Sequence, residues 1–323
     1  MSLKVSNLYI SNSNSKMKRF LIYITILLVV TLTYLIILEY LVGKIPNSYS
    51  YKYNYVKNNG GKIEALAIGH SQLYSSFVPD SFYLPSFNLC NSKQSFEDNY
   101  YILQELLPYM PHLKMVIMPI GYTNVATTPK VNDPLKTNSF HRRCRYYHKY
   151  MNIDYGGRLP FQYYYESFDP CSAIRKVYSY YINHSEMVGC DSLGKDNQNL
   201  QPDFGLGNLY TIHTRKERKG FSVDGEYFLL KTIKLLADMK ITVIMVSPPY
   251  YWDCFKEIND AQKQFLYNYM RVLCKKYPVK YINLETDPTY EYDDFFNETH
   301  LGDRGAKKFT HQLNSIIKNG DFE

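Results

Sequence analysis

Residues 62–71 read KIEALAIGHS, an apolar run that ends on Gly69 and is followed at once by polar side chains. A short apolar run closed by glycine is typical of a strand buried inside a parallel sheet. Ser71 would then stand just beyond the carboxyl end of this strand, where open α/β sheets bind their ligands. The stretch therefore predicts both a class of fold and the place of its site.

Strands and helices alternate along much of the remaining chain. We expect further strands at 86–91, 113–121, 241–249 and 279–285, and helices at 95–110, 224–240, 259–277 and 303–319. Ser95 stands three residues before Asp98, which is the spacing of a helix N-cap with its capping box. The alternation of apolar strands with helices predicts an α/β fold whose parallel sheet is covered on both faces.

The stretch 122–220 interrupts this alternation. It is rich in Tyr, Asn and Pro, and only the parts near 138–151 and 171–184 have a helical pattern. We interpret it as an insertion in one α/β domain of residues 62–323. The chain has neither GxGxxG nor GxxxxGK[ST], so we expect no dinucleotide site and no P-loop.

Residues 20–38, FLIYITILLVVTLTYLIIL, carry no charge. At 1.5 Å per residue they span roughly the 30 Å hydrocarbon core of a bilayer. No small-residue cleavage site follows them, which favours an uncleaved, single-pass signal anchor. We expect a cytoplasmic N-terminus at 1–19, a transmembrane helix at 20–42 and a linker at 43–61, with the α/β domain periplasmic or extracellular.

Composition limits the classes of partner. Of the 323 residues 45% are hydrophobic and 21% are charged, which is enough to bury a substantial core. The formal net charge is +7, and basic clusters at 141–150 and 212–218 indicate a surface that attracts anions such as phospholipid head groups or acidic polysaccharide. No zinc-finger, helix-turn-helix or RNA-binding pattern accompanies this charge, so we expect no nucleic-acid partner.

Cysteine and histidine spacing gives little support for a metal site. The six cysteines include no CxxC pair, and their pairing is left open by the sequence. His70, His300, Asp293 and Asp294 could converge on a metal ion, but no segment has the ligand spacing of a metalloprotease or a deaminase. We rank this interpretation below the others and expect neither a metal nor a cofactor.

A histidine near the C-terminus is a candidate partner for Ser71. A serine hydroxyl is a poor nucleophile unless a base removes its proton. His300 lies in DDFFNETHLGDRGAKKFT (293–310), between the last expected strand and the last helix, and so at the same edge of the sheet as Ser71. Asn297 stands three residues before this histidine, where it could orient the ring.

Together, IGHS (68–71) and NETHLGDRGAKKF (297–309) resemble the SGNH, or GDSL-like, hydrolase superfamily. The likeness is closest to a membrane-anchored, exported branch whose members act in O-acetylation of envelope polysaccharides and D-alanylation of teichoic acids. It extends over most of residues 62–318, including 86–124 and 243–251. The resemblance implies a flavodoxin-like three-layer α/β sandwich with a parallel sheet.

The resemblance also implies residue roles. The family's Gly-x-Ser matches residues 69–71 and its closing Asp-x-x-His matches 297–300, so Ser71 would be the nucleophile, His300 the general base and Asn297 its orienting group. The resemblance implies three oxyanion donors. They are the backbone N–H of Ser71, the backbone N–H of Asn91 or Ser92, and the side chain of Asn124.

Several positions depart from the family's pattern. Asn297 stands where the family usually has Asp, and an amide stabilises an imidazolium less than a carboxylate does. Asp294 could substitute for that carboxylate if its loop folds back. His70 replaces the common Asp beside the serine, the second-block Gly is not clearly present, and Gly121 and Asn124 stand one residue too far apart.

Two functions from different classes remain open. The first is an esterase or O-acyltransferase that acts on a cell-envelope glycan or glycolipid, with water or a sugar hydroxyl as acceptor; the resemblance implies a membrane-bound acyl donor protein as a partner. The second is a catalytically weak or inactive component that binds glycan or partner proteins in an envelope assembly.

Overall fold

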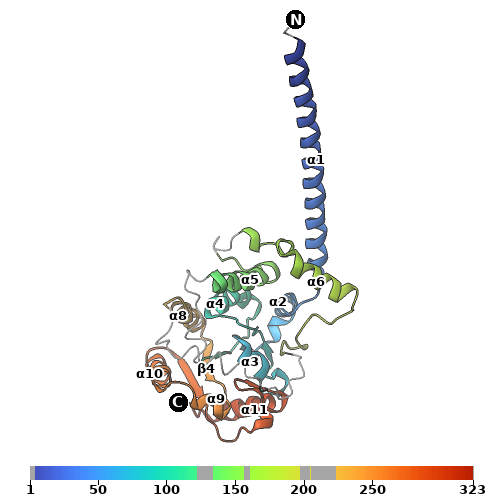
Figure 1. Ribbon diagram of the computed structural model, residues 1–323. Coiled ribbons are helices and arrows are strands. Elements are labelled where there is room, and N and C mark those ends of the chain that lie inside the picture. The colour runs from blue at the N-terminus through green and yellow to red at the C-terminus, as the bar shows by residue number, and fades with distance from the viewer. Residues whose placement is uncertain (1–3, 122–133, 156–160, 197–203, 205–222, 323) are drawn as a thin grey trace. The chain divides into compact units, whose positions relative to one another are not determined.

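The computed structural model describes residues 4–121, 134–155, 161–196, 204 and 223–322 (Figure 1). The chain divides into two compact units. The first comprises Met1–Pro46 and Pro160–Met187, and the second comprises Asn47–Leu159 and Val188–Glu323. Part of the stretch interpreted as an insertion of the α/β domain therefore belongs to the unit of the N-terminal helix.

The first unit is helical. It consists of α1 (Lys4–Gly43), the 3-10 turns η4 (Phe161–Tyr163) and η5 (Glu166–Phe168), and α6 (Pro170–Tyr181). Within the described part of the chain, α1 is the one helix that is long and apolar enough to cross a membrane, over Ser15–Gly43. Leu38 and Val42 of α1 form a buried cluster with Ala173 of α6.

A five-stranded parallel sheet forms the centre of the second unit. Its strands are β1 (Ala65–Ala67), β2 (Ser86–Asn88), β3 (Met115–Pro119), β4 (Thr242–Ser247) and β5 (Val279–Asn283). Their order is β2-β1-β3-β4-β5, and every pairing is parallel. The α/β fold predicted from the sequence is thus confirmed, and the carboxyl ends of all five strands lie at one edge.

Helices, turns and a small hairpin complete the second unit. The helices are α2 (Ser48–Asn59), α3 (Ser71–Ser76), α4 (Phe96–Leu106), α5 (Pro134–Met151), α8 (Val223–Asp238), α9 (Trp252–Lys256), α10 (Asp260–Lys276) and α11 (Asp303–Asn319). The 3-10 turns are η1 (Gly60–Lys62), η2 (Pro79–Ser81), η3 (Leu107–Tyr109) and η6 (Tyr292–Asp294). The antiparallel hairpin pairs β6 (Phe295–Asn297) with β7 (His300–Leu301). Ser95 caps α4 in a capping box with Asp98, as the sequence predicts.

Both faces of the sheet are covered. Ala67 of β1 and Val246 of β4 share one buried cluster with Leu73 of α3 and Phe309 of α11. The alternate residues of the strands, Leu66 among them, point to the opposite face and are equally buried. Right-handed crossovers place α4, α8 and α10 over that second face, and α8 and α10 contact β4 and β5.

The segment predicted as a linker is a helix over much of its length. Helix α2 begins after Asn47, whose side chain accepts a hydrogen bond from the backbone N–H of Ser50 at 3.0 Å. Lys52 and Val56 of this helix are fully buried within the second unit. Of the predicted linker 43–61, only residues 43–47 and 60–61 lie outside α2. Helix α2 is therefore part of the α/β unit and not a linker.

Candidate active site

A glycine turn places Ser71 at the start of α3. Strand β1 ends at Ala67, and Gly69 then adopts φ 148°, a left-handed conformation that favours glycine. A Cβ atom at this position would lie 2.4 Å from the ring of Pro119. Nδ1 of His70 caps the helix by accepting a hydrogen bond from the backbone N–H of Gln72 at 3.4 Å. The turn therefore sets Ser71 just beyond the carboxyl end of the strand.

The β6–β7 hairpin brings His300 to Ser71. Nε2 of His300 lies 2.8 Å from Oγ of Ser71, and Nδ1 lies 3.0 Å from Oδ1 of Asn297. Strand β7 contacts both α3 and α11, so the hairpin is held against the helix that begins with the serine. Three of the residues singled out in the sequence thus meet in one hydrogen-bonded chain.

Backbone hydrogen bonds determine which nitrogen of His300 carries the proton. Oδ1 of Asn297 accepts the backbone N–H groups of Thr299 and His300, each at 3.1 Å. These donors require an oxygen at that position, so the amide cannot be reversed without placing its NH₂ group against them. Nδ1 of His300 must then donate to the same oxygen, which leaves Nε2 as the acceptor for the hydroxyl of Ser71. This is the tautomer that a general base requires.

Burial lowers the pKa of His300 to about 4, from an ordinary value of 6.5. Burial removes the hydration that stabilises a charged imidazolium, so the protonated form is disfavoured. The amide of Asn297 supplies no negative charge to offset that loss. The ring is therefore neutral at pH 7 and can accept a proton. It is also a weaker base than a histidine paired with a carboxylate.

Asp294 does not substitute for the missing carboxylate. Its side chain is fully buried and forms ion pairs with Arg304 at 3.0 Å and Lys308 at 2.9 Å, while its Oδ2 also accepts the backbone N–H of Glu291. The two basic residues are one turn apart on α11, so both reach the same carboxylate. The alternative in which Asp294 orients His300 is therefore wrong, because the carboxylate is held in a separate cluster.

The residues predicted as oxyanion donors have different outcomes. The backbone N–H of Asn91 donates to the carbonyl of Gly69 at 3.0 Å, so it is not available to a substrate oxygen. Ser92 is exposed, next to Lys93 in a turn after β2. Asn124 lies outside the described residues. Ser71 itself occupies the first position of α3, where a backbone N–H has no partner within the helix.

Two neighbours of the predicted residues also belong to the site. The hydroxyl of Thr299 lies 3.0 Å from Nδ1 of His300 and 3.3 Å from Oδ1 of Asn297. Nε2 of Gln72 donates to the carbonyl of Thr299 at 3.0 Å, which ties the first turn of α3 to the hairpin. The sequence signal for both was their position beside Ser71 and His300, which is too general to single them out.

A buried asparagine on β2 supports helix α3, which begins with Ser71. Nδ2 of Asn88 donates to the carbonyls of Leu73 and Tyr74 at 3.2 Å and of Phe77 at 3.0 Å. Its Oδ1 accepts the backbone N–H of Cys90 at 3.1 Å. One side chain thereby joins the C-terminal end of α3 to strand β2, in addition to the backbone N–H groups that Leu73 and Tyr74 also accept.

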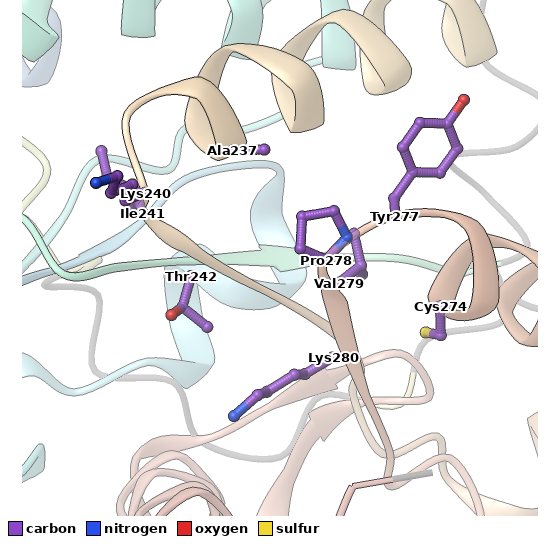
Figure 2. Close-up of a pocket in the computed structure, with 9 residues that line it drawn as sticks. All are labelled: Ala237, Lys240, Ile241, Thr242, Cys274, Tyr277, Pro278, Val279 and Lys280. Carbon is purple, nitrogen blue, oxygen red and sulfur yellow. The ribbon is translucent and has the colours of Figure 1, made fainter.

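The metal site considered from the sequence finds no support among the described residues, and a surface pocket lies away from Ser71. Among the residues that the structure describes, no group of three or more His, Cys, Asp or Glu is arranged to hold a metal ion. The pocket in Figure 2 is lined by residues that include Thr242 and Val279, the first residues of β4 and β5. It therefore lies at the amino edge of the sheet, opposite to Ser71.

Comparisons with known proteins assign no family to the chain. No protein-family model matches it, and no curated protein matches it. The geometry around Ser71 is therefore the basis on which a function can be proposed.

Proposed function

We propose that the protein is a membrane-anchored serine esterase or O-acyltransferase of the SGNH type. The observation that carries this proposal is the 2.8 Å contact between Oγ of Ser71 and Nε2 of His300, with Asn297 on the other ring nitrogen. A serine, a histidine and an orienting group joined in this order are the parts of an acyl-transfer site. The strand order β2-β1-β3-β4-β5 is the flavodoxin-like order, which supports the same superfamily.

The proposed reaction uses Ser71 as a covalent nucleophile. Its oxygen attacks the ester carbonyl carbon while its proton passes to Nε2 of His300. The tetrahedral oxyanion takes hydrogen bonds from the backbone N–H of Ser71 and from Ser92 or Asn124. His300 then returns the proton to the leaving alcohol, and the acyl group remains on Ser71.

The second half of the reaction decides between hydrolysis and transfer. A water molecule or a sugar hydroxyl loses its proton to Nε2 of His300 and attacks the acyl carbon on Ser71. The acyl–serine bond breaks, and the serine oxygen takes the proton back from His300. Water as acceptor makes the protein an esterase, whereas a sugar hydroxyl makes it an acyltransferase.

The membrane helix supports an envelope substrate. We propose that residues 1–19 are cytoplasmic, because they carry four positive charges and no acid, and that the α/β unit lies outside the cytoplasm. A unit anchored there has access to an envelope glycan or glycolipid and to a membrane-bound acyl donor protein. The net charge of +7 favours an acidic polymer as the acceptor.

One observation favours a second candidate function. The amide of Asn297 and the pKa of about 4 for His300 describe a site that stabilises an imidazolium poorly. The second candidate is a protein that keeps the fold and binds glycan or a partner in an envelope assembly with little turnover. Measured turnover separates the two.

The test is hydrolysis of a small activated acetate ester by the full chain in detergent or nanodiscs. We expect Ser71→Ala to lower the rate constant by about 10³-fold or more, because the nucleophile is lost. Ser75→Ala, one turn further along α3, is the matched control and should keep the wild-type rate. A Ser71→Ala protein with full activity would contradict the proposal, and an inactive wild type would favour the binding function.

A further inference from the structure

The first unit exposes an unusual amount of apolar surface beside the end of its membrane helix. The members are large aromatic or aliphatic side chains of η4, η5, α6 and adjoining residues, each 43–66% exposed: Phe161, Tyr165, Phe168, Ile174, Tyr178 and Ile182. We call this set the α6 apolar surface. The rings of Phe161, Tyr165 and Phe168 contact one another, so they form a continuous aromatic patch.

Helix α6 is apolar on two faces. Ala173 and Val177, four residues apart, pack against α1. Ile174, Tyr178 and Ile182 follow the same spacing on a second stripe that is exposed. A helix on the surface of a globular protein typically has one apolar stripe, which faces the core. The second, exposed stripe of α6 is therefore not explained by packing within this unit.

The polar side of α6 is narrow. At about 100° per residue, the polar side chains fall on the one arc that the two apolar stripes leave free, and they are Ser172, Arg175, Lys176 and Ser179. Lys176 pairs there with the buried carboxylate of Glu166 in η5. An apolar face with aromatic residues, separated from a polar face that carries basic residues, is the pattern of a helix that lies in the plane of a membrane interface.

Contacts with α1 hold these elements beside the C-terminal end of its uncharged stretch. The backbone N–H of Ser167 in η5 donates to Oε2 of Glu39 at 2.8 Å, and the hydroxyl of Tyr181 donates to the carbonyl of Leu41 at 3.3 Å. Glu39 is the first charged residue after the uncharged stretch 20–38, which by itself fills roughly the 30 Å hydrocarbon core. In Figure 1, α6 lies beside the C-terminal end of α1. Tyrosines are enriched at this depth of a bilayer.

We infer that η4, η5 and α6 lie in the interface of the bilayer that α1 crosses, and bury the α6 apolar surface among lipid head groups and the adjoining acyl chains. The surface continues the lipid-facing side of α1, whose residues from Phe20 to Ile37 are largely exposed. Lipid around α1 can therefore cover the α6 apolar surface without a partner protein. The inference concerns the first unit alone and does not depend on catalysis.

The single tryptophan of the chain, Trp252, allows a direct test. In a Trp252→Phe background, Tyr178→Trp places an indole on the exposed stripe, and Ser179→Trp places one on the polar arc of the same helix. The full chain is reconstituted in phosphatidylcholine nanodiscs with or without lipids brominated in the upper part of the acyl chain. Bromine quenches an indole only at close range, so quenching reports contact with lipid.

We expect quenching of Tyr178→Trp to be at least about twice that of Ser179→Trp. The two side chains leave a helix about 10 Å across in different directions, so only the indole at position 178 should contact the brominated chains. Ile182→Trp lies on the same stripe and should behave like Tyr178→Trp, which covers the case that one variant misfolds. Equal quenching on the stripe and on the polar arc would overturn the inference. Blue-shifted but unquenched emission on the stripe would overturn it too, because a protein would then cover the surface.

Discussion

Asn297→Asp is the substitution that examines the site most closely. It replaces the amide nitrogen by an oxygen and leaves the rest of the side chain unchanged. The remaining oxygen can still accept the backbone N–H groups of Thr299 and His300, so the hairpin should keep its geometry. What changes is that a negative charge stands 3.0 Å from Nδ1 of His300.

The size of the effect follows from that distance. Opposite charges about 4 Å apart attract by about 4 kcal/mol at an effective dielectric constant of about 20, which corresponds to about 3 pKa units. The new carboxylate must itself be buried, so the net rise in the pKa of His300 is about 1–3 units. The pKa should therefore move from about 4 to between about 5 and 7.

The assay is the rate of acetate-ester hydrolysis from pH 3.5 to 9, with circular dichroism at each pH to verify folding. Only the neutral imidazole acts as a base, so activity is lost as the pH falls through the pKa of His300. We expect the acid limb of the wild type near pH 4. In Asn297→Asp that limb should lie between about pH 5 and 7, with a rate at pH 8 that is about tenfold higher because the base is stronger.

Two outcomes would refute this reasoning. One is an unchanged acid limb, which would mean that position 297 does not act on His300. The other is a rate at pH 8 that falls on substitution, which would mean that the amide is required. Asn259→Asp adds the same charge at the exposed N-cap of α10 and should leave the acid limb in place.

Two further predictions concern stability of the full chain in detergent. Asn88→Ala removes the buried hydrogen bonds that this side chain makes to three carbonyls of α3 and its C-cap and to the backbone N–H of Cys90, so the free energy of unfolding should fall by about 2–4 kcal/mol in a urea titration. A loss below about 1 kcal/mol would contradict the role assigned to this residue. His300 has a folded pKa of about 4, below its ordinary 6.5, so the unfolded chain takes up the proton first as the pH falls. The wild type should lose up to about 3 kcal/mol more than His300→Gln between pH 6.5 and 4, and parallel pH profiles of the two proteins would disprove this.

The strands and most long helices could be predicted because their apolar patterns are strong. The run before Gly69 and the residues around Val116 and Ile244 are buried on both faces of a parallel sheet, and such strands appear as continuous apolar stretches. Helix α11 follows the predicted bounds 303–319, because Gly302 and Gly320 flank it and its apolar face is regular.

The short and polar elements could not be predicted in the same way. Helix α3 has six residues and is capped by His70, which is outside the usual set of N-cap residues. Helix α2 reads SYSYKYNYVKNN, with few aliphatic residues. It is held by burial of Val56 and by the hydrogen bond from Nζ of the buried Lys52 to the carbonyl of Cys90, which only the tertiary structure reveals. The β6–β7 hairpin has strands of three and two residues, too short for any alternation to show.

The pairing of Ser71 with His300 was within reach of the sequence, because both follow strands of one parallel sheet. Asp294 is close to His300 along the chain, but its carboxylate is paired with Arg304 and Lys308 instead. Arg304 and Lys308, four residues apart on one face of α11, are the signal that was available, since two cations so spaced attract a buried carboxylate.

The central claim is that His300 activates Ser71, and labelling with a fluorophosphonate serine probe tests it most directly. The full chain is labelled as wild type, Ser71→Ala and His300→Ala, with His311→Ala, an exposed histidine of α11, as the matched control. We expect the wild type and His311→Ala to be labelled on the peptide that contains Ser71, and the other two variants to remain unlabelled. A folded wild type that takes no label, or a label that survives the loss of His300, would contradict the account.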